Sequence, residues 1–328
     1  MKKLFDNYKG KEVFQYTLKD EDIEVDIIDF GARINAIRVK GVDIVLGCNK
    51  VEDFMHDNFY LGATVGRSAN RIKDSKFTLN GIEYKLTNNE NNNQLHGGFL
   101  GFDKQIFNLE SFRENRLCLS YLSKDGEEGY PGDLILKVVF SLENNSLKIE
   151  YTATSNKDTI FAPTCHAYFN LDGEDKGDAL DNLLMINSDE ITITGPGLIS
   201  TGETMKVENT PFDFRELRTI RKKIDDDCLK STRGYDHNFI LNSEKAAVVK
   251  SNKTGIEMQI FTDLPCVQLY TAGFLHVNNG KSRGYIANDG FCIEPQYVPN
   301  TMNLEGFAKP IVKKGTVSQH YIKYLFIF

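Results

Sequence analysis

The sequence has 328 residues, of which 41% are hydrophobic and 26% charged, with a formal net charge of −7 at pH 7. This composition is typical of a globular protein with a sizeable core, and the negative charge gives no electrostatic footprint for nucleic acid. The longest apolar runs are only a few residues, and the N-terminal segment lacks an apolar stretch, so neither a membrane span nor a secretory signal is indicated. We therefore expect a cytoplasmic protein whose partner is a small molecule, not nucleic acid or a membrane.

Short β-prone stretches separated by turn residues follow one another along most of the chain. Within 76–86, Asn80 and Gly81 lie between two such stretches and predict a hairpin, because both central residues of its turn need positive φ. Further alternating or β-branched stretches occur at 133–151, 147–156 and 246–262. Their spacing is the one expected of a β-sandwich or barrel.

One segment, 214–228, shows helical spacing of its apolar residues, and we expect a short helix there. The pattern contains no series of longer helices of the kind that connects parallel strands. Eight prolines are dispersed, and no Gly/Ser-rich or charged linker divides the chain. The sequence therefore predicts a mainly β protein with one domain over residues 1–328.

Six cysteines are scattered singly along the chain. They lack both the CxxC pairs of a zinc site and the density of a disulfide scaffold. We expect reduced thiols and no structural zinc.

Two of the six histidines lie among polar and small residues: His96 in NNNQLHGG and His166 in APTCHAYFNLDG. The glycines after His96 would let the backbone approach a ligand closely. Each histidine also has a structural interpretation. His96 suits a loop before a Gly-Gly turn, and His166 suits a buried histidine whose ring is satisfied by the backbone.

Planar polar side chains recur in three further segments. GRSANRI (66–72) offers Arg67, Asn70 and Arg71, GYDHNF (234–239) offers Asp236, and PCVQLYT (265–271) offers Gln268 and Tyr270. Together with aromatic faces, such groups suit the hydroxyls of a sugar. Taken singly, each also fits a surface ion pair, a solvent-facing strand position or a turn cap.

Glu294, in FCIEPQYVPN (291–300), follows three residues that suit a buried strand. Pro295 comes next and has no N–H to donate to a β ladder. We expect this proline to end the ladder at a point where the Glu294 carboxylate faces an open pocket.

Taken in order, these segments resemble the aldose 1-epimerase family, the galactose mutarotases. The resemblance covers almost the whole chain through DIVLGCNKVEDF, GRSANRI, QLHGGFLGFDKQIF, CHAYFNLDG, PFDFR, GYDHNFIL, VQLYTAGFL and GFCIEPQYVPN. It implies an antiparallel β supersandwich with few short helices. It also implies interconversion of the α and β anomers of hexoses such as galactose and glucose, without a cofactor or metal.

Residue by residue, the resemblance implies Glu294 as the catalytic base and His166 as the general acid. The reaction removes a proton from the C1 hydroxyl and gives one to the ring oxygen, which a carboxylate and an imidazolium can do. Because a histidine is only partly protonated at neutral pH, we expect the Glu294 charge to keep His166 protonated. The family's contacts to the sugar fall on Asn70, Arg71, His96, Tyr168, Asp236 and Gln268.

Three alternatives stay open at this point. A glycoside hydrolase would need two carboxylates across a scissile bond, and a sugar-binding homologue without turnover would not need the acid and base. A hexose 6-phosphate epimerase would place cations such as Arg67, Arg215 and Arg233 around the phosphate. The chain departs from the usual family pattern at Ser68, Cys165, Ala167 and Asn300. The sequence leaves open the preferred sugar and whether the protein is a monomer or a homodimer.

Overall fold

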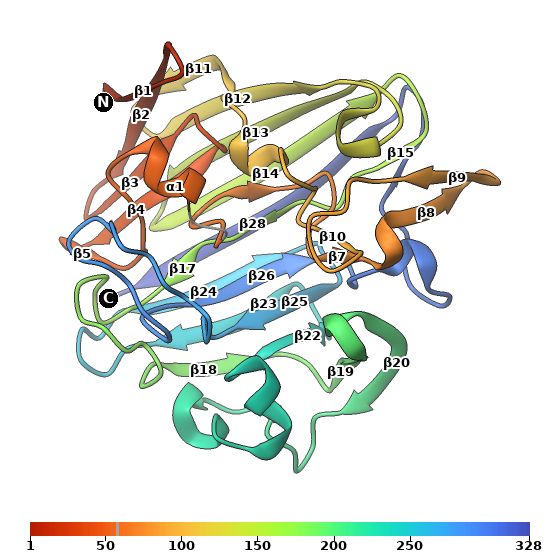
Figure 1. The fold of residues 1–328 in the computed structure, drawn as a ribbon. Coiled ribbons are helices and arrows are strands. Elements are labelled where there is room, and N and C mark those ends of the chain that lie inside the picture. The colour runs from red at the N-terminus through yellow and green to blue at the C-terminus, as the bar shows by residue number, and fades with distance from the viewer. Residues whose placement is uncertain (57–58) are drawn as a thin grey trace.

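The computed structural model describes residues 1–56 and 59–328. Antiparallel strands dominate it, and its helical segments are short (Figure 1). Within the described residues, the strands form sheets of nine, six and five strands and four two-stranded ribbons. The prediction of a mainly antiparallel β architecture is confirmed.

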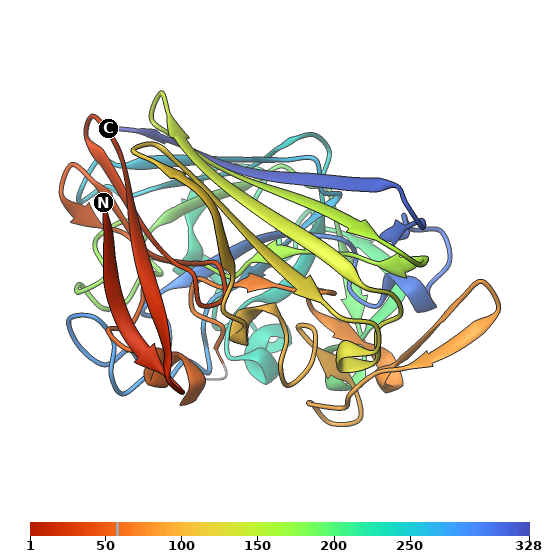
Figure 2. The ribbon, with the colours of Figure 1, turned by 90° about the horizontal axis from the view of Figure 1, so that it is seen from above.

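The nine-stranded sheet forms one broad layer of the molecule. In spatial order its strands are β11 (Asn108–Arg113), β12 (Arg116–Ser123), β13 (Leu134–Glu143), β14 (Ser146–Ser155), β28 (Val317–Ile327), β24 (Glu257–Thr262), β23 (Lys245–Lys250), β18 (Leu183–Ile186) and β21 (Arg218–Thr219). Strands β11 to β14 are successive hairpins, and the C-terminal strand β28 lies between β14 and β24. Figure 2 shows β11 to β14 and β28 side by side in this layer.

The six-stranded sheet packs its apolar face on this layer. Its strands in spatial order are β17 (Tyr168–Phe169), β26 (Phe291–Gln296), β25 (Cys266–Tyr270), β22 (Asp236–Ile240), β19 (Glu190–Thr194) and β20 (Ser200–Lys206). Phe239, Leu269 and Ile293 share one buried cluster with Ile149 and Ile260 of the nine-stranded sheet. Because successive side chains of a strand point to opposite faces, the other face of this sheet is free to carry polar groups.

The remaining elements surround these two sheets. The five-stranded N-terminal sheet consists of β1 (Lys2–Tyr8), β2 (Lys11–Asp20), β3 (Ile23–Ile28), β4 (Arg33–Val39) and β5 (Val42–Asp43). The ribbons are β6 (Thr64–Val65) with β16 (Thr164–Cys165), β7 (Arg71–Ile72) with β10 (Gln94–Leu95), β8 (Lys76–Leu79) with β9 (Ile82–Lys85), and β15 (Thr159–Ile160) with β27 (Ile311–Val312).

The helical segments are one α-helix and several 3₁₀ turns. They are α1 (Val51–His56), η1 (Lys73–Ser75), η2 (Phe102–Lys104), η3 (Glu127–Gly129), η4 (Pro196–Leu198), η5 (Ile220–Lys223), η6 (Asp227–Thr232) and η7 (Thr301–Asn303). Among the described residues, no helix combines the length and apolar character needed to cross a bilayer.

The predicted hairpin at 76–86 is confirmed. Strands β8 and β9 pair directly across the turn, where φ is 52° at Asn80 and 77° at Gly81. The other predicted stretches form β13, β14, β23 and β24. Local turn chemistry and alternation were therefore sufficient to locate these strands.

The helix predicted over 214–228 is wrong. The segment forms strand β21, the turn η5 and the start of the turn η6. Leu217 is 48% exposed, so the apolar positions do not form one buried stripe. The Asp226 side chain accepts a hydrogen bond from the backbone N–H of Cys228 and caps a new turn there.

Pro295 does not end its strand, contrary to the expectation. Strand β26 continues to Gln296, and Pro295 lies opposite Val267 of β25. On the other side of β26, the short strand β17 pairs only with Phe291 and Cys292. Pro295 is tolerated because β17 builds no ladder beside it.

Candidate active site

Glu294 lies on the face of β26 that points away from the core. Its neighbour Ile293 is in the core, and the Glu294 side chain points to the opposite face while only 2% of the residue is exposed. The Oε2 atom of Glu294 has no hydrogen-bond partner among the described residues. Because an unpartnered buried carboxyl destabilises a fold, it indicates a functional group.

His166 faces Glu294 from the link between β16 and β17. Its backbone N–H donates to the Ala63 carbonyl, and its carbonyl accepts from the Gly62 N–H, both at 2.9 Å. The His166 Nε2 atom is 3.6 Å from Oε2 of Glu294, and Nδ1 is 3.5 Å from Sγ of Cys292. The imidazole and the carboxyl are therefore close neighbours, but they are too far apart for a good hydrogen bond. A third group in the cavity can contact both.

His96 approaches the same place from the loop after β10. Its Nδ1 accepts a hydrogen bond from the Asn70 backbone N–H at 3.2 Å, so the neutral ring carries its proton on Nε2. The ring centre of His96 lies 5.1 Å from that of His166 and 4.6 Å from that of Tyr60. At Gly97, φ is 88°, and a Cβ atom would lie 1.9 Å from the Gly66 carbonyl oxygen. Glycine is therefore required beside His96 for this loop to pack.

Arg71 is held in position by an acidic partner. Its Nε and Nη2 atoms donate to the two carboxylate oxygens of Glu90 at 2.6 and 2.7 Å. Such a two-bond contact fixes the guanidinium plane and leaves its other donors available. The Asn70 side chain accepts from the backbone N–H of Arg71 at 2.8 Å.

Asp236 and Gln268 lie side by side on β22 and β25. The Gln268 Nε2 atom donates to Oδ1 of Asp236 at 2.6 Å. Behind them, Nε2 of Gln296 donates to Oδ1 of Asn238 at 3.0 Å. This buried network orients the Asp236 carboxylate.

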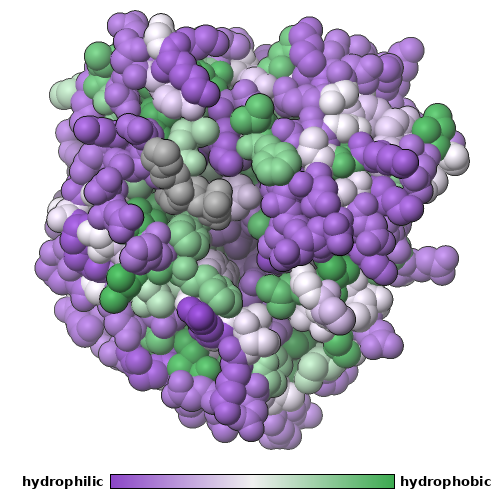
Figure 3. Space-filling model, in the orientation of Figure 1, coloured by the Kyte–Doolittle hydropathy of each residue, from purple (hydrophilic) through white to green (hydrophobic). Residues whose placement is uncertain are grey.

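One cavity of about 320 Å³ brings together all eight residues singled out in the sequence. These are Asn70, Arg71, His96, His166, Tyr168, Asp236, Gln268 and Glu294. The space-filling view shows a hollow near the middle of the face drawn in Figure 1, over the six-stranded sheet (Figure 3). The pocket is less open than expected, because His166 and Glu294 are only 4% and 2% exposed.

Further lining residues were missed by sequence reasoning. They are Phe59, Tyr60, Glu90, Leu95, Leu198 and Phe274. Leu95 ends β10, Leu198 ends the turn η4, and the rest come from loops. No local sequence pattern reveals which residues such segments contact in space. Tyr270, named with Gln268 from the segment 265–271, lies two positions after it on β25 and also lines the cavity.

Burial shifts the protonation of the central pair. Desolvation raises the pKa of Glu294 well above its usual value, and the Asp236 charge adds to the rise. Desolvation lowers the pKa of His166 to about 3 and that of His96 well below the usual range. The expectation that Glu294 keeps His166 protonated is wrong for the resting pair, because burial penalises both charges. Burial therefore favours the neutral form of each group over its charged form.

His96, His166 and Glu294 also meet a distance condition for a metal, with one potential ligand atom from each within 4.8 Å of the others. The hydrogen bonding does not fit. A histidine that binds a metal donates its other ring N–H to an acceptor. His96 instead accepts from the Asn70 N–H, which leaves the proton on Nε2. The arrangement suits proton transfer better than metal binding.

The arginines considered for a phosphate lie outside the cavity lining. Arg67 is buried and donates to the carbonyls of Pro131, Ser123 and Gly132. Arg215 binds Asp213 through two hydrogen bonds of 2.9 Å. Arg233 lies over the ring of Phe274, 4.9 Å from its centre. Among the described lining residues, the cation is Arg71, which Glu90 already pairs.

The fold and site together define a class: an antiparallel β supersandwich with an acid–base pair in a polar cavity on one face of a sheet. A family model for aldose 1-epimerase matches residues 15–325. Galactose mutarotase of Bos taurus is 37% identical over 319 residues, which cover 94% of this chain and 92% of that protein. Aldose 1-epimerase of Haemophilus influenzae is 36% identical over 300 residues, covering 88% of this chain and 87% of that protein.

Solved structures show the same likeness. An aldose epimerase homologue from C. elegans superposes with a TM-score of 0.90 at 28% identity, covering 95% of this chain and 98% of that one. Galactose 1-epimerase from Lactobacillus acidophilus superposes with a TM-score of 0.89 at 28% identity, covering 100% of this chain and 98% of that one. The chain belongs to the aldose 1-epimerase family.

Proposed function

We propose that the protein is an aldose 1-epimerase that interconverts the α and β anomers of neutral hexoses such as galactose and glucose. The observation that carries the proposal is the 3.6 Å approach of Nε2 of His166 to Oε2 of Glu294 inside a polar cavity. The C1 hydroxyl and the ring oxygen of a pyranose are both bonded to C1. A carboxylate and an imidazolium that are neighbours can therefore act on both oxygens at once.

The proposed mechanism depends on one proton that Glu294 and His166 share. A protonated carboxyl with a neutral imidazole, and a carboxylate with an imidazolium, contain the same number of protons. In the second form, Glu294 takes the C1 hydroxyl proton while His166 protonates the ring oxygen. The C1 to ring-oxygen bond breaks, the aldehyde turns about the C1–C2 bond, and the reverse steps close the ring on its other face.

The other polar side chains have roles in holding the sugar. Arg71 and Asp236 are oriented by Glu90 and Gln268 before the sugar arrives, which reduces the ordering cost of binding. His96 offers an Nε2–H donor beside the ring oxygen. Tyr168, whose ring centre lies 5.1 Å from that of His166, packs against the acid.

The same contacts argue against the alternatives. A glycoside hydrolase needs a second free carboxyl, whereas Glu90 is paired with Arg71 and Asp236 accepts from Gln268. A hexose 6-phosphate epimerase needs several cations around a phosphate, and Arg67 and Arg215 are committed elsewhere. Arg233, which lies over the lining residue Phe274, is the one of the three near the cavity. Neutral hexoses therefore suit the cavity best. A cytoplasmic location and a single domain remain predictions.

Polarimetry tests the proposal directly. The decay of optical rotation is followed for fresh α-D-galactose, α-D-glucose and glucose 6-phosphate, with and without the protein. We expect acceleration of the first two above the spontaneous rate and a smaller effect on the phosphate. A protein that leaves all three rates unchanged would contradict the activity, and a preference for the phosphate would favour the alternative.

A further inference from the structure

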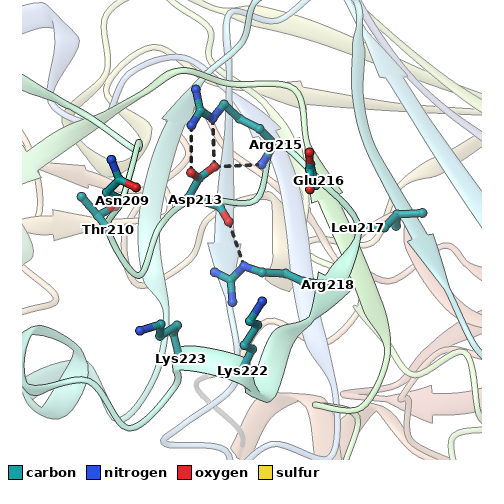
Figure 4. A pocket seen from close by; sticks show the side chains of 9 residues that line it. All are labelled: Asn209, Thr210, Asp213, Arg215, Glu216, Leu217, Arg218, Lys222 and Lys223. Carbon is teal, nitrogen blue, oxygen red and sulfur yellow. Dashed lines mark hydrogen bonds and ion pairs between the residues drawn. The ribbon is translucent and has the colours of Figure 1, made fainter.

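A second hollow lies on the segment that connects β20 to β22. Its volume is about 820 Å³, and none of its lining residues lines the catalytic cavity. The turn at 209–213 forms one side of it, and β21 with η5 forms the other (Figure 4).

Three cations of this hollow form no salt bridge within the described residues, although Lys223 interacts electrostatically with the Asp226 carboxylate. Arg218, Lys222 and Lys223 line it, and within residues 1–56 and 59–328 none of them forms an ion pair. Two neighbouring arginines, in contrast, do form ion pairs. Arg215 binds Asp213 at 2.9 Å, and Arg221 binds Asp181 at 2.7 Å. The unpaired charges are notable in a protein whose net charge is −7.

Arg218 is fixed in place although it lacks a carboxylate partner. Its Nε atom donates to the Asp213 carbonyl at 2.8 Å, and its Nη2 atom donates to the Tyr235 hydroxyl at 3.3 Å. The guanidinium carbon lies 3.6 Å from the ring centre of Phe214. The Nη1 atom is buried and has no hydrogen-bond partner among the described residues. A further hydrogen bond joins Nη2 to the Pro211 carbonyl. The fold thus holds a permanent cation in one orientation at the wall of the hollow.

The Lys222 side chain points toward Arg218, whereas the end of the Lys223 side chain is directed away from both (Figure 4). Like charges at such positions repel one another. Of the two acids that line the hollow, Asp213 is bound by Arg215, and Glu216 lies beside Arg215 on the side away from the lysines. An anion placed beside Arg218 and Lys222 would relieve this repulsion and gain charge-assisted hydrogen bonds, and the flexible Lys223 side chain is near enough to add its charge.

We propose that this hollow binds a tetrahedral oxyanion of the phosphate class, either as the free ion or as the phosphate group of a small metabolite. Arg218 is the fixed anchor, and Lys222 and Lys223 supply flexible point charges around the anion. Arg218 also contacts Tyr235, the residue before Asp236, so the anion lies next to the strand that carries a proposed sugar contact. The site is separate from the sugar cavity and does not depend on the proposed epimerase activity.

Isothermal titration calorimetry with inorganic phosphate tests the proposal, with sodium chloride holding the ionic strength constant so that general screening is the same throughout. We expect one saturable site. The double variant Lys222→Gln with Lys223→Gln should weaken binding about tenfold or more, because charge-assisted hydrogen bonds are lost. The matched control is Lys11→Gln with Lys137→Gln, two exposed strand lysines outside the hollow. Its phosphate affinity should equal that of the wild type.

Two further titrations complete the test. Glycerol 3-phosphate in place of inorganic phosphate distinguishes the sources: tighter binding of the ester indicates a phosphorylated metabolite, and equal or weaker binding indicates free phosphate. Saturating galactose should leave the phosphate affinity unchanged. The proposal is overturned if neither probe gives saturable binding, if both double variants lose affinity equally, or if galactose displaces phosphate.

Discussion

The proposed reaction depends on a single proton that Glu294 and His166 hold between them. Their 3.6 Å separation allows that proton to reside on either group without any change in total charge. Burial favours the form in which the carboxyl holds it, since desolvation raises the pKa of Glu294 and lowers that of His166 to about 3. A sugar that hydrogen-bonds to both groups would stabilise the charged form as the reaction begins.

We expect the His166 ring to stay neutral between pH 5 and pH 8, although a free histidine titrates at about 6.5. Histidine NMR of the unliganded protein checks this, with the His166 signals assigned by their loss in His166→Asn. Signals that stay constant over this range agree with the account. A midpoint near 6.5 would show that the cavity does not desolvate the ring.

Arg71→Ala should reduce kcat/KM about 10- to 100-fold, mainly through KM, because a hydrogen bond to a charged group contributes roughly 1.5–3 kcal/mol. Arg71→Lys should recover only part of this, since an ammonium cannot reproduce the two-bond contact with Glu90. Steady-state polarimetry gives both constants. An unchanged kcat/KM in Arg71→Ala would remove this residue from the sugar contacts.

At the scale of the secondary-structure element, one face of strand β26 packs in the core and the other lines the cavity. Ile293 is fully buried in the core, and Glu294 points from the opposite face into the cavity. Alternation along one strand therefore explains how an acidic residue follows a core sequence without disturbing the core.

This division predicts opposite effects of two neighbouring substitutions. Ile293→Ala should lower the free energy of unfolding by about 2–5 kcal/mol, because it leaves a cavity in the core. Glu294→Gln should stay within about 1 kcal/mol of the wild type or be more stable, because it removes a buried acid that has no hydrogen-bond partner at Oε2. Urea denaturation compares them. A large loss of stability in Glu294→Gln would mean that the carboxyl is structural.

The sequence allowed accurate prediction where local chemistry determines structure. Asn80 and Gly81 specify their turn by themselves, and β-branched alternation located β13 and β24. The segment 214–228 was predicted incorrectly because its helical spacing is overridden by tertiary contacts, in which Phe214 packs on Tyr235 and β21 pairs with β18. Propensity is a weak guide when packing decides the outcome.

At the scale of the whole molecule, three buried histidines link stability to pH. Desolvation lowers the pKa of His237 to about 4 and of His166 to about 3, and it lowers that of His96 well below its usual value. In the unfolded chain these rings titrate near 6.5, so below that pH the unfolded state binds more protons. Their contribution to stability is therefore lost as pH falls from about 6.5 toward 4. Asp29 and Asp103, with pKa values raised to about 6 by burial, act in the opposite direction.

A substitution of His237 isolates the contribution of one buried histidine to the pH dependence of stability. In His237→Gln, the free energy of unfolding should fall less steeply between about pH 6.5 and pH 4.5 than in the wild type, because one ring that the unfolded state protonates is gone. The matched control is His276→Gln, which changes an exposed histidine and should retain the wild-type slope. Chemical denaturation at several pH values gives the slopes. Equal slopes in His237→Gln and the wild type would contradict a neutral, buried His237.

Some residues of the cavity can be predicted from the sequence, and others depend on how the whole molecule folds. The ordered motifs singled out Glu294, His166 and Asp236, which lie far apart in the chain but line one cavity. Phe59 and Phe274 come from loops and Leu198 from the turn η4, and the positions of these segments depend on the packing of whole sheets. The protonation of the pair was also mispredicted, because it depends on burial, which the sequence does not specify.

The most direct test of the account is the turnover of Glu294→Gln on α-D-galactose, measured by polarimetry and corrected for the spontaneous rate. An amide cannot accept the C1 hydroxyl proton, and removal of a general base costs about 100- to 10000-fold. We predict a loss of kcat in that range by a variant that remains folded and still binds galactose. A folded variant that keeps more than about a tenth of the wild-type kcat would contradict the assignment of Glu294 as the base.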